Sequence, residues 1–337
     1  MKSKHLLING KKVGPGCPVY IIAEMGINHN GRLSTALKMV DVAKKSGVDA
    51  VKIQIVYAAK SYVKNTESYK IFKDVELSLK NWQTIISRAK NYGLDIFASF
   101  PCPQDVYLSK EFDLAANKVS SSNVTNFPLL KAMAKIKKPI LMSCGLSTIK
   151  EVTEAVAYLT KHGNRELAIL QCTALYPTPY EDVNLNTIKG LQEKYGRPVG
   201  FSDHSNGIHC AVAAVALGAC IIEKHYTLDP TMAGPDHHFS SSPKELTEMV
   251  RAIRNVEQAM GTFDKKPVAQ EIEKRKTLQR VIVAAKDIKK NEVFSEKNVT
   301  VKRPLNGKGY HPGYYERLLG QRAVYDYSTD AVITQRI

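Results

Sequence analysis

Lysine, serine and histidine side chains recur at or near the ends of short apolar segments in this sequence. Lys52 and Gln54 stand two residues apart in the segment 50–54, and Lys118 lies in the segment 116–119. A lysine facing the inside of a fold is costly unless it meets an anion. The lysines therefore predict a cradle for a phosphate or carboxylate group. Serines at or just after the ends of other apolar segments would add hydroxyl groups to this predicted cradle: Ser99, Ser121, Ser143 and Ser202.

Two histidines follow apolar segments in the same way. His204 and His225 end segments that come one after the other along the chain. Two imidazoles with an added carboxylate would suit Mn²⁺ or a similar ion. The alternative is that the histidines are separate and satisfied by the protein, that each lysine pairs with a structural glutamate, and that the serines cap helices or turns. His237, in a loop, is expected to be solvated.

The order of apolar and amphipathic segments predicts an α/β fold. Longer helical patterns, such as residues 33–46, 82–91, 148–161, 208–217 and 243–260, separate eight predicted strands. This alternation over about 260 residues favours a closed (β/α)8 TIM barrel covering residues 1–262. An open doubly wound sheet is the alternative, but no glycine-rich dinucleotide fingerprint follows the first strand. The predicted strands cover residues 19–23, 50–54, 95–98, 116–119, 139–142, 168–172, 199–201 and 220–223.

The pattern changes after the last long helix. Residues 263–279 are polar, charged and interrupted by Pro267, as a linker would be. Residues 280–337 contain two short apolar segments and several glycines, which predicts a small β-rich domain.

Composition limits the class of protein. The chain has 337 residues, a formal net charge of +16, and six cysteines without a CxxC pair. The spacing of the cysteines indicates reduced thiols, and no segment has the length of a signal peptide or a membrane span. The basic residues are scattered as pairs without interleaved aromatic residues, so we expect a cytoplasmic protein with no nucleic-acid and no membrane partner.

Several motifs in order along nearly the whole chain resemble the sialic acid synthase family. They are AEMGINHNG (23–31), VKIQ (51–54), YPTPYEDVNL (176–185), SDHS (202–205), EKH (223–225) and GPDHHFS (234–240). VKRPLNGKG (301–309) resembles the antifreeze-like (SAF) domain found at the C-terminus of that family. The resemblance implies a (β/α)8 barrel joined to an antifreeze-like domain, in a domain-swapped homodimer where that domain covers the partner's barrel.

The resemblance also implies a reaction. Phosphoenolpyruvate would condense with an N-acyl amino-sugar aldehyde, N-acetylmannosamine or a related diacetamido sugar, to give a nonulosonic acid and phosphate. The cofactor would be a divalent metal, Mn²⁺ first, with Mg²⁺ or Co²⁺ possible. The methylene carbon of phosphoenolpyruvate would attack the sugar aldehyde, and phosphate would leave by C–O cleavage.

Residue roles follow from the matched positions. The resemblance assigns catalysis to Glu24, Gln54 and Asp236, and metal binding to His204 and His225. It assigns phosphoenolpyruvate binding to Lys52, Ser99, Lys118, Ser121, Ser143 and Ser202. It assigns sugar binding to Gln54, Tyr176, Asp236, Asn123 and, from the partner subunit, Arg303.

Two departures from the family pattern bear on the sugar. Asn123 stands where the family usually has glutamate, and Ala174 where it often has asparagine. A lost carboxylate changes which sugar groups can be paired. Two other functions stay open: another phosphoenolpyruvate–aldose synthase, of the 3-deoxy-sugar-acid phosphate type, and a non-catalytic protein that binds carbohydrate or nucleic acid.

Overall fold

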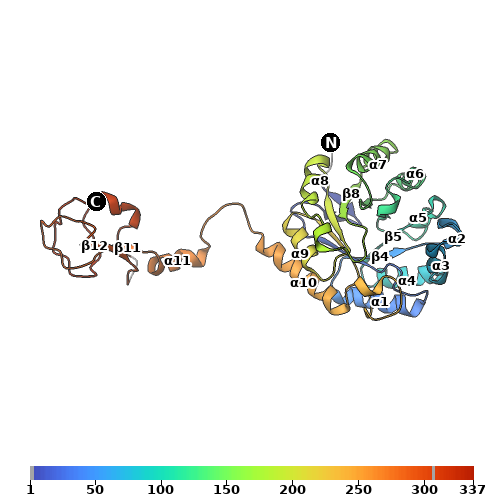
Figure 1. Ribbon diagram of the computed structural model, residues 1–337, viewed down its shortest axis with the longest axis horizontal. Helices are drawn as coiled ribbons and strands as arrows, with labels where there is room; N and C mark the ends of the chain where they lie inside the picture. The colour runs from blue at the N-terminus through green and yellow to red at the C-terminus, as the bar shows by residue number, and fades with distance from the viewer. Residues whose placement is uncertain (1–3, 306–307) are drawn as a thin grey trace. The chain divides into compact units, whose positions relative to one another are not determined.

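The chain folds into two compact units that divide after Gly261. The computed structural model describes residues 4–305 and 308–337 (Figure 1). Asn306 and Gly307 of the VKRPLNGKG motif lie outside the described residues. The first unit is an α/β barrel with helices around it, and the second carries the C-terminal strands.

The first unit is built on a closed barrel of parallel strands, as the sequence predicts. Its neighbours run in the order β10-β3-β4-β5-β6-β7-β8-β9, and β10 closes the ring by pairing with β3. The strands are β3 (Tyr20–Glu24), β4 (Ala50–Gln54), β5 (Asp95–Ser99), β6 (Asn117–Val119), β7 (Ile140–Ser143), β8 (Leu167–Cys172), β9 (Val199–Asp203) and β10 (Ile221–His225).

Helices cover the outside of the barrel, and their ends are set by local capping. Thr148 and Glu151 form a capping box at the start of α7, and Ser242 and Glu245 form another at the start of α10. Gly47 ends α1 in the left-handed region at φ 78°. The helices of this unit are α1 (Leu33–Ser46), α2 (Ala58–Ser61), α3 (Glu67–Asp74), α4 (Leu79–Asn91), α5 (Leu108–Glu111), α6 (Phe127–Ile136), α7 (Ile149–Lys161), α8 (Thr187–Tyr195), α9 (His209–Ala216) and α10 (Pro243–Ala259).

Side-chain alternation divides each barrel strand between two environments. Ile21 and Ala23 of β3 pack outward with the helices, whereas Tyr20 and Ile22 belong to the apolar cluster inside the barrel. This inner cluster fills the lower part of the barrel. It leaves the carboxyl ends of the strands for polar side chains, where barrel enzymes carry their sites.

A short hairpin, which the sequence analysis did not predict, lies at the amino ends of the strands. β1 (Leu6–Ile8) pairs antiparallel with β2 (Lys11–Val13). Buried Asp95, at the start of β5, accepts hydrogen bonds from Asn9 (2.8 Å), Lys11 (2.9 Å) and the Tyr20 hydroxyl (2.8 Å). This carboxylate therefore fixes the hairpin as the floor of the barrel.

The second unit has its own core. β11 (Val281–Ala284) pairs antiparallel with β12 (Val299–Lys302), and α12 (Tyr315–Leu318) contributes buried Leu318. Within the predicted linker of residues 263–279, Ala269–Leu278 form helix α11. No residue of α11 is buried within the unit, so its helical hydrogen bonds form without a packed face.

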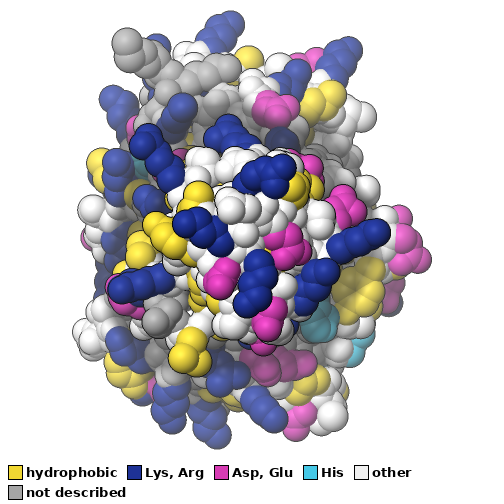
Figure 2. Space-filling view, turned by 90° about the vertical axis from the view of Figure 1, so that its left-hand side faces the viewer, with side chains coloured by type: hydrophobic (Ala, Val, Ile, Leu, Met, Phe, Trp, Pro, Cys, Tyr) yellow, Lys and Arg dark blue, Asp and Glu magenta, His cyan; other side chains and the backbone are white. Residues whose placement is uncertain are grey.

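The surface shown in Figure 2 has Lys and Arg side chains spread among Asp and Glu side chains. This is the dispersed pattern expected from the scattered basic pairs in the sequence. Across residues 4–305 and 308–337, no helix combines the length and the apolar character needed to cross a membrane.

Candidate active site

The two predicted lysines lie buried inside the barrel, and each meets a glutamate. Lys52 forms an ion pair with Glu24 of the neighbouring strand, as their register in the ladder requires. Lys118 pairs with Glu223 of β10, with 3.1 Å between Nζ and Oε1. All four residues are less than 5% exposed. Paired in this way, the charges of the two lysines are balanced before any substrate arrives.

Hydroxyl groups complete the network around Lys118. Lys118 Nζ donates to Ser143 Oγ at 2.8 Å, and Ser202 Oγ donates to Glu223 Oε1 at 2.8 Å. Oε2 of Glu223 is buried and has no hydrogen-bond partner. The network thus joins β6, β7, β9 and β10 and keeps one carboxylate oxygen unpaired at the centre of the barrel.

His204 and His225 come together at the same mouth. Their ring centroids are 5.5 Å apart, and both rings face Tyr176, at 4.2 Å and 6.3 Å. Phe239 packs 5.2 Å from both His225 and Tyr176. The histidines therefore share an aromatic wall, and they are neighbours rather than two separate sites.

The three residues predicted to catalyse lie around Glu24 and His225. Glu24 Oε1 accepts from the backbone N–H of Gly26 at 2.7 Å and from Gln54 Nε2 at 3.4 Å. Asp236 Oδ2 lies 4.0 Å from His225 Nδ1. A carboxylate, an amide and a second carboxylate thus line one side of the mouth, which suits proton transfer and the binding of sugar hydroxyl groups.

Burial controls the electrostatics of this site. It lowers the pKa of Lys52 to about 7, against the attraction of Glu223, and the charge of Lys118 lowers it further. For Glu223, burial acts to raise the pKa, but Lys118 and Lys52 outweigh it, so this carboxyl stays ionised. Burial also raises the pKa of Asp236 and lowers that of His225 well below its ordinary value.

Of the remaining predicted residues of the barrel, Ser99 and Ser121 lie near the Lys118 network, whereas Asn123 bonds within its own turn. Ser99 ends β5 and lies opposite Lys118 in the ladder, and Ser121 donates to Cys172 Sγ at 3.5 Å. Asn123, predicted to bind sugar, makes its hydrogen bonds within its own turn. It donates to Ser120 at 2.8 Å and accepts from Asn126 at 3.0 Å.

Arg303 lies in the second unit and is exposed. Its predicted role, contact with the sugar from the partner subunit, concerns an assembly rather than a single chain. The contact of Arg303 with the sugar therefore stays a prediction that rests on the family resemblance.

The expectation that His237 is solvated is wrong. His237 is 1% exposed, and its ring nitrogens contact Thr227 Oγ1 at 2.6 Å and Asn30 Oδ1 at 3.3 Å. The expectation assumed an extended loop, but residues His237–Phe239 form a 3₁₀ turn that directs the ring inward.

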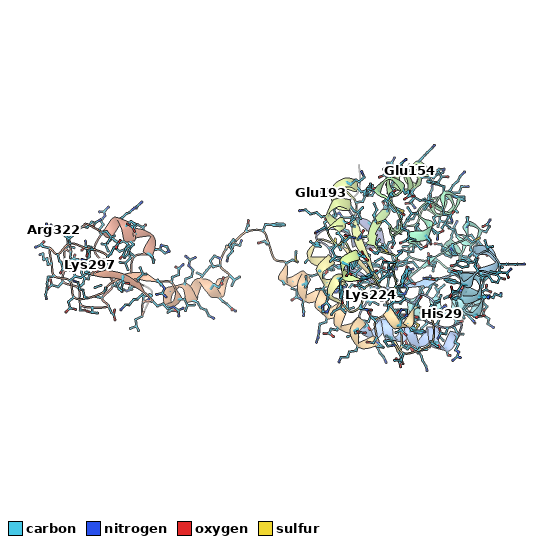
Figure 3. The ribbon with its side chains drawn as sticks, viewed as in Figure 1. His29, Glu154, Glu193, Lys224, Lys297 and Arg322 are labelled. Carbon is cyan, nitrogen blue, oxygen red and sulfur yellow. The ribbon has the colours of Figure 1, made fainter. Side chains whose placement is uncertain are left out.

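The sequence pattern assigned no role to Glu223 or to Cys172. Glu223 stands two residues before His225, so strand alternation places it on the same inward face. That signal could have identified it. Cys172 is buried, and its Sγ lies 3.7 Å from His204 Nδ1, in the wall of the site. The pair Asp203–Lys224, at 2.8 Å, is equally buried and ties β9 to β10. Figure 3 labels Lys224 within the barrel unit.

The two histidines are suited to a metal ion in their hydrogen bonding. His204 Nδ1 donates to the carbonyl of Thr173 at 2.8 Å, which leaves the lone pair on Nε2. His225 is held neutral by burial, and its Nδ1 is buried without a hydrogen-bond partner. Within the described part of the chain no three His, Cys, Asp or Glu side chains group as a metal site. A bound cation would therefore take its other ligands from water or substrate.

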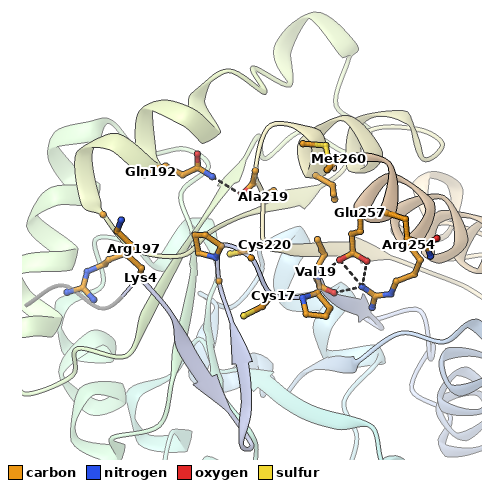
Figure 4. A pocket seen from close by; sticks show the side chains of 18 of the residues that line it. Lys4, Cys17, Val19, Gln192, Arg197, Ala219, Cys220, Arg254, Glu257 and Met260 are labelled. Atoms are coloured by element: carbon orange, nitrogen blue, oxygen red, sulfur yellow. Dashed lines mark hydrogen bonds and ion pairs between the residues drawn. The ribbon is translucent and has the colours of Figure 1, made fainter. Parts of the chain in front are cut away.

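A cavity of about 910 Å³ lies at the other end of the barrel, where β3 and β10 begin (Figure 4). Arg254 in its wall is already paired, with Glu257 at 3.0 Å and Asp49 at 3.0 Å. Because this charge is neutralised and the cavity is remote from His204 and His225, it is not the candidate active site.

The chain matches two family models and is similar to several named synthases. The NeuB family matches residues 39–265, and the SAF domain matches residues 279–336. The N,N'-diacetyllegionaminic acid synthase of Campylobacter jejuni is 39% identical, over 94% of this chain and 98% of that protein. A pseudaminic acid synthase of the same species is 38% identical, over 91% and 93%.

A solved structure supports the same relationship. The N-acetylneuraminic acid (sialic acid) synthetase of Leptospira borgpetersenii, in complex with citrate, is 34% identical and has a TM-score of 0.76. The match covers 82% of this chain and 98% of that one.

Proposed function

This chain belongs to the NeuB family, and we propose that it is a nonulosonic acid synthase that condenses phosphoenolpyruvate with an N-acyl amino-sugar aldehyde and releases phosphate. The observation that carries the proposal is the buried network of Lys52, Lys118 and their hydroxyl partners beside His204 and His225. The named relatives are synthases of different nonulosonic acids, N,N'-diacetyllegionaminic acid and pseudaminic acid, so the proposal specifies the substrate class and leaves the particular sugar open.

Lys52 and Lys118 would bind the anionic groups of phosphoenolpyruvate. Both ammonium groups are shielded from water, where an ion pair is stronger than at the surface. Because each lysine already has a glutamate partner, binding of the anion requires that the glutamates move away or that the site takes up protons, Lys52 included above pH 7. Ser99, Ser121, Ser143 and Ser202 would supply hydroxyl donors to the same groups.

Glu24, Gln54 and Asp236 would act on the sugar and the reacting centre. Glu24 is placed to hold or return a proton, since its carboxylate touches Lys52 and accepts from Gln54. Tyr176 and Phe239 would exclude water from one side of the sugar. Asp236, whose pKa burial raises, would hydrogen-bond a sugar hydroxyl group.

His204 and His225 would hold a divalent cation, for which we propose Mn²⁺. When bound, such a cation polarises a carbonyl oxygen and so activates an aldehyde. The residues of the chain keep their roles around it: Thr173 orients the ring of His204, and Asp236 lies beside that of His225.

We further propose that the active form is a homodimer in which Arg303 of the second unit serves the barrel of the other subunit. The basis is the match of the SAF domain together with the resemblance described above. The substrate phosphoenolpyruvate is a cytoplasmic metabolite, and we therefore place the protein in the cytoplasm.

The function is tested by phosphate release from phosphoenolpyruvate with Mn²⁺ and a panel of aldoses. The panel holds N-acetylmannosamine, a 2,4-diacetamido-6-deoxy hexose and a phosphorylated aldose. We expect phosphate release that depends on an N-acyl amino sugar. A preference for the phosphorylated aldose would favour a 3-deoxy-sugar-acid phosphate synthase, and no release by the folded protein would contradict the proposal.

A further inference from the structure

Two asparagines in the loop after β3 bind the adjacent loop after β10, which carries Asp236. Asn28 Nδ2 donates to the carbonyl of Tyr226 and to Ser240 Oγ, both at 2.9 Å. Asn30 Nδ2 donates to the carbonyl of Ala233 at 2.9 Å. The mouth clasp, defined as Asn28, Asn30, His237 and Ser240, therefore joins the first and last strands of the barrel.

The clasp fixes the backbone at Asp236 and at the residue that follows it. Ser240 Oγ donates to the Asp236 carbonyl at 2.5 Å while it accepts from Asn28. The next residue, His237, is buried and contacts Asn30 Oδ1 through Nε2 at 3.3 Å. The backbone of Asp236 is thus fixed at its own carbonyl and at the adjoining side chain.

The hydrogen bonding determines the chemical form of the clasp. Because the amide nitrogen of Asn30 faces the Ala233 carbonyl, its oxygen must face His237 and accept a hydrogen there. His237 then carries its proton on Nε2, and its Nδ1 accepts from the Thr227 hydroxyl at 2.6 Å. An aspartate at position 30 would instead direct a carboxylate oxygen at a carbonyl.

Close packing keeps the two loops from approaching further, and the hydrogen bonds of the clasp keep them from moving apart. A Cβ on Gly26, at φ +53°, would lie 3.0 Å from Asp236 Oδ2 and 3.1 Å from the His225 ring. A Cβ on Gly234, at φ +143°, would lie 2.7 Å from His237 and 2.9 Å from Asn30 Oδ1. The glycines allow the contact, and the clasp sets the distance between Asp236 and His225.

We propose that Asn30 and His237 are positioning residues that hold the Asp236 carboxylate beside His225 and thereby set the use of the second, sugar substrate. This inference rests on the proposed function for Asp236. Neither residue has to touch the sugar, since their effect passes through the backbone at residues 233–240. Phosphoenolpyruvate would be bound by Lys52 and Lys118, which the clasp does not contact.

The test compares Asn30→Ala and Asn30→Asp with the wild-type protein. We expect kcat/KM for the sugar to fall about tenfold to hundredfold in Asn30→Ala, as a displacement near 1 Å of a reacting group would cause, and further in Asn30→Asp. Phosphoenolpyruvate affinity should stay within about twofold, because its lysines are untouched. An equal loss for both substrates, or no loss, would overturn the proposal.

A double-mutant cycle separates positioning from general damage. In an Asp236→Ala background, Asn30→Ala should have little further effect on kcat/KM for the sugar, because the group it positions is gone. Full additivity of the two substitutions would overturn the proposal. His237→Gln, which keeps an N–H donor, should recover part of the activity that His237→Phe loses.

A matched control is Asn164→Ala. Asn164 is buried and, like Asn30, donates its amide nitrogen to a backbone carbonyl, that of Lys138 at 2.8 Å. Its amide oxygen accepts from the Glu166 N–H at 3.0 Å, and it precedes β8 at the far end of the strand. We expect a similar loss of stability and an unchanged kcat/KM for the sugar. A sugar defect in Asn164→Ala as large as in Asn30→Ala would overturn the proposal.

Hydrogen exchange gives a readout that needs no turnover. In the full-length protein, Asn30→Ala should speed exchange of the backbone amides of residues 233–240 and leave those of β6 unchanged. Unaltered exchange at residues 233–240 would overturn the clasp even if the protein had no synthase activity. A wild-type protein inactive on all sugars would count against the proposed function alone.

Discussion

At the residue scale, the site depends on buried charges that are paired with one another. Lys118 and Glu223 are both less than 5% exposed, and Glu223 keeps one oxygen without a partner. Such a pair is weak evidence of stability, because desolvation offsets attraction, but breaking it leaves an uncompensated charge. The pairing therefore serves binding more than folding.

Lys118→Met should lower the free energy of unfolding by about 3–5 kcal/mol, because Glu223 then stays buried without its cation. The double variant Lys118→Met/Glu223→Leu should recover most of that stability, since it removes both charges. Phosphoenolpyruvate affinity should be lost in both variants. Denaturant unfolding and calorimetric titration measure the two effects. Recovery of binding together with stability would show that Lys118 is only structural.

The pKa of Lys52 leads to a prediction about protons. It is about 7 in the folded chain against an ordinary value of 10.5, so between those values the unfolded chain binds more protons. The Lys52 contribution therefore makes the free energy of unfolding rise with pH across that range. A bound anion favours the charged amine, so phosphoenolpyruvate binding above pH 7 should take up a proton.

The uptake is measured by calorimetric titration in two buffers with different enthalpies of ionisation. We expect little Lys52-linked uptake at pH 6 and a clear uptake at pH 8.5. Lys52→Arg, whose guanidinium stays charged, should show no such increase. Proton release at pH 8.5, or the same increase in the arginine variant, would refute a role for the lowered pKa of Lys52.

At the element scale, the carboxyl ends of the strands carry the chemistry and the amino ends carry stability. Asp95, which holds the hairpin floor, lies at the amino end of β5. Asp95→Ala should lower the free energy of unfolding by about 2–4 kcal/mol, and Tyr20→Phe by about 1 kcal/mol, because buried donors or one hydrogen bond are lost. Thermal unfolding measures these losses of stability. The kcat of both variants should equal that of the wild-type protein. A large loss of kcat would contradict the division between floor and mouth.

Element prediction from the sequence succeeded where apolar segments were long. The barrel strands and α1 could be located because apolar residues alternate with amphipathic helical patterns. The hairpin β1–β2 was not predicted because β2 buries only Val13 and the hairpin lies outside the alternation of strands and helices. The inward turn of His237 was not predicted, and the pairing of the lysines with glutamates was only an alternative, because both depend on contacts between distant parts of the chain.

At the scale of the whole molecule, the proposal makes each active site from two chains. Arg303 lies in a unit with its own core, whereas the lysines and histidines lie in the barrel. If the second unit serves the partner's barrel, two inactive variants should complement one another. We therefore expect activity when Lys118→Met/Glu223→Leu protein is unfolded and refolded together with Arg303→Ala protein.

The expected rate is about a quarter of the wild-type rate per chain, because half of randomly paired dimers are mixed and each mixed dimer has one complete site. The control is the same mixture combined without unfolding, in which the original dimers persist. No recovery after joint refolding, with dimers shown to be mixed, would place Arg303 in its own subunit's site or outside the site.

The central claim is that Lys52 and Lys118 bind phosphoenolpyruvate beside His204 and His225 at the barrel mouth. A crystal structure with phosphoenolpyruvate bound tests it most directly. We predict that its phosphate and carboxylate contact the two lysine ammonium groups and that the Lys52–Glu24 contact lengthens. Phosphoenolpyruvate bound elsewhere, with both lysine–glutamate pairs unchanged, would contradict the claim.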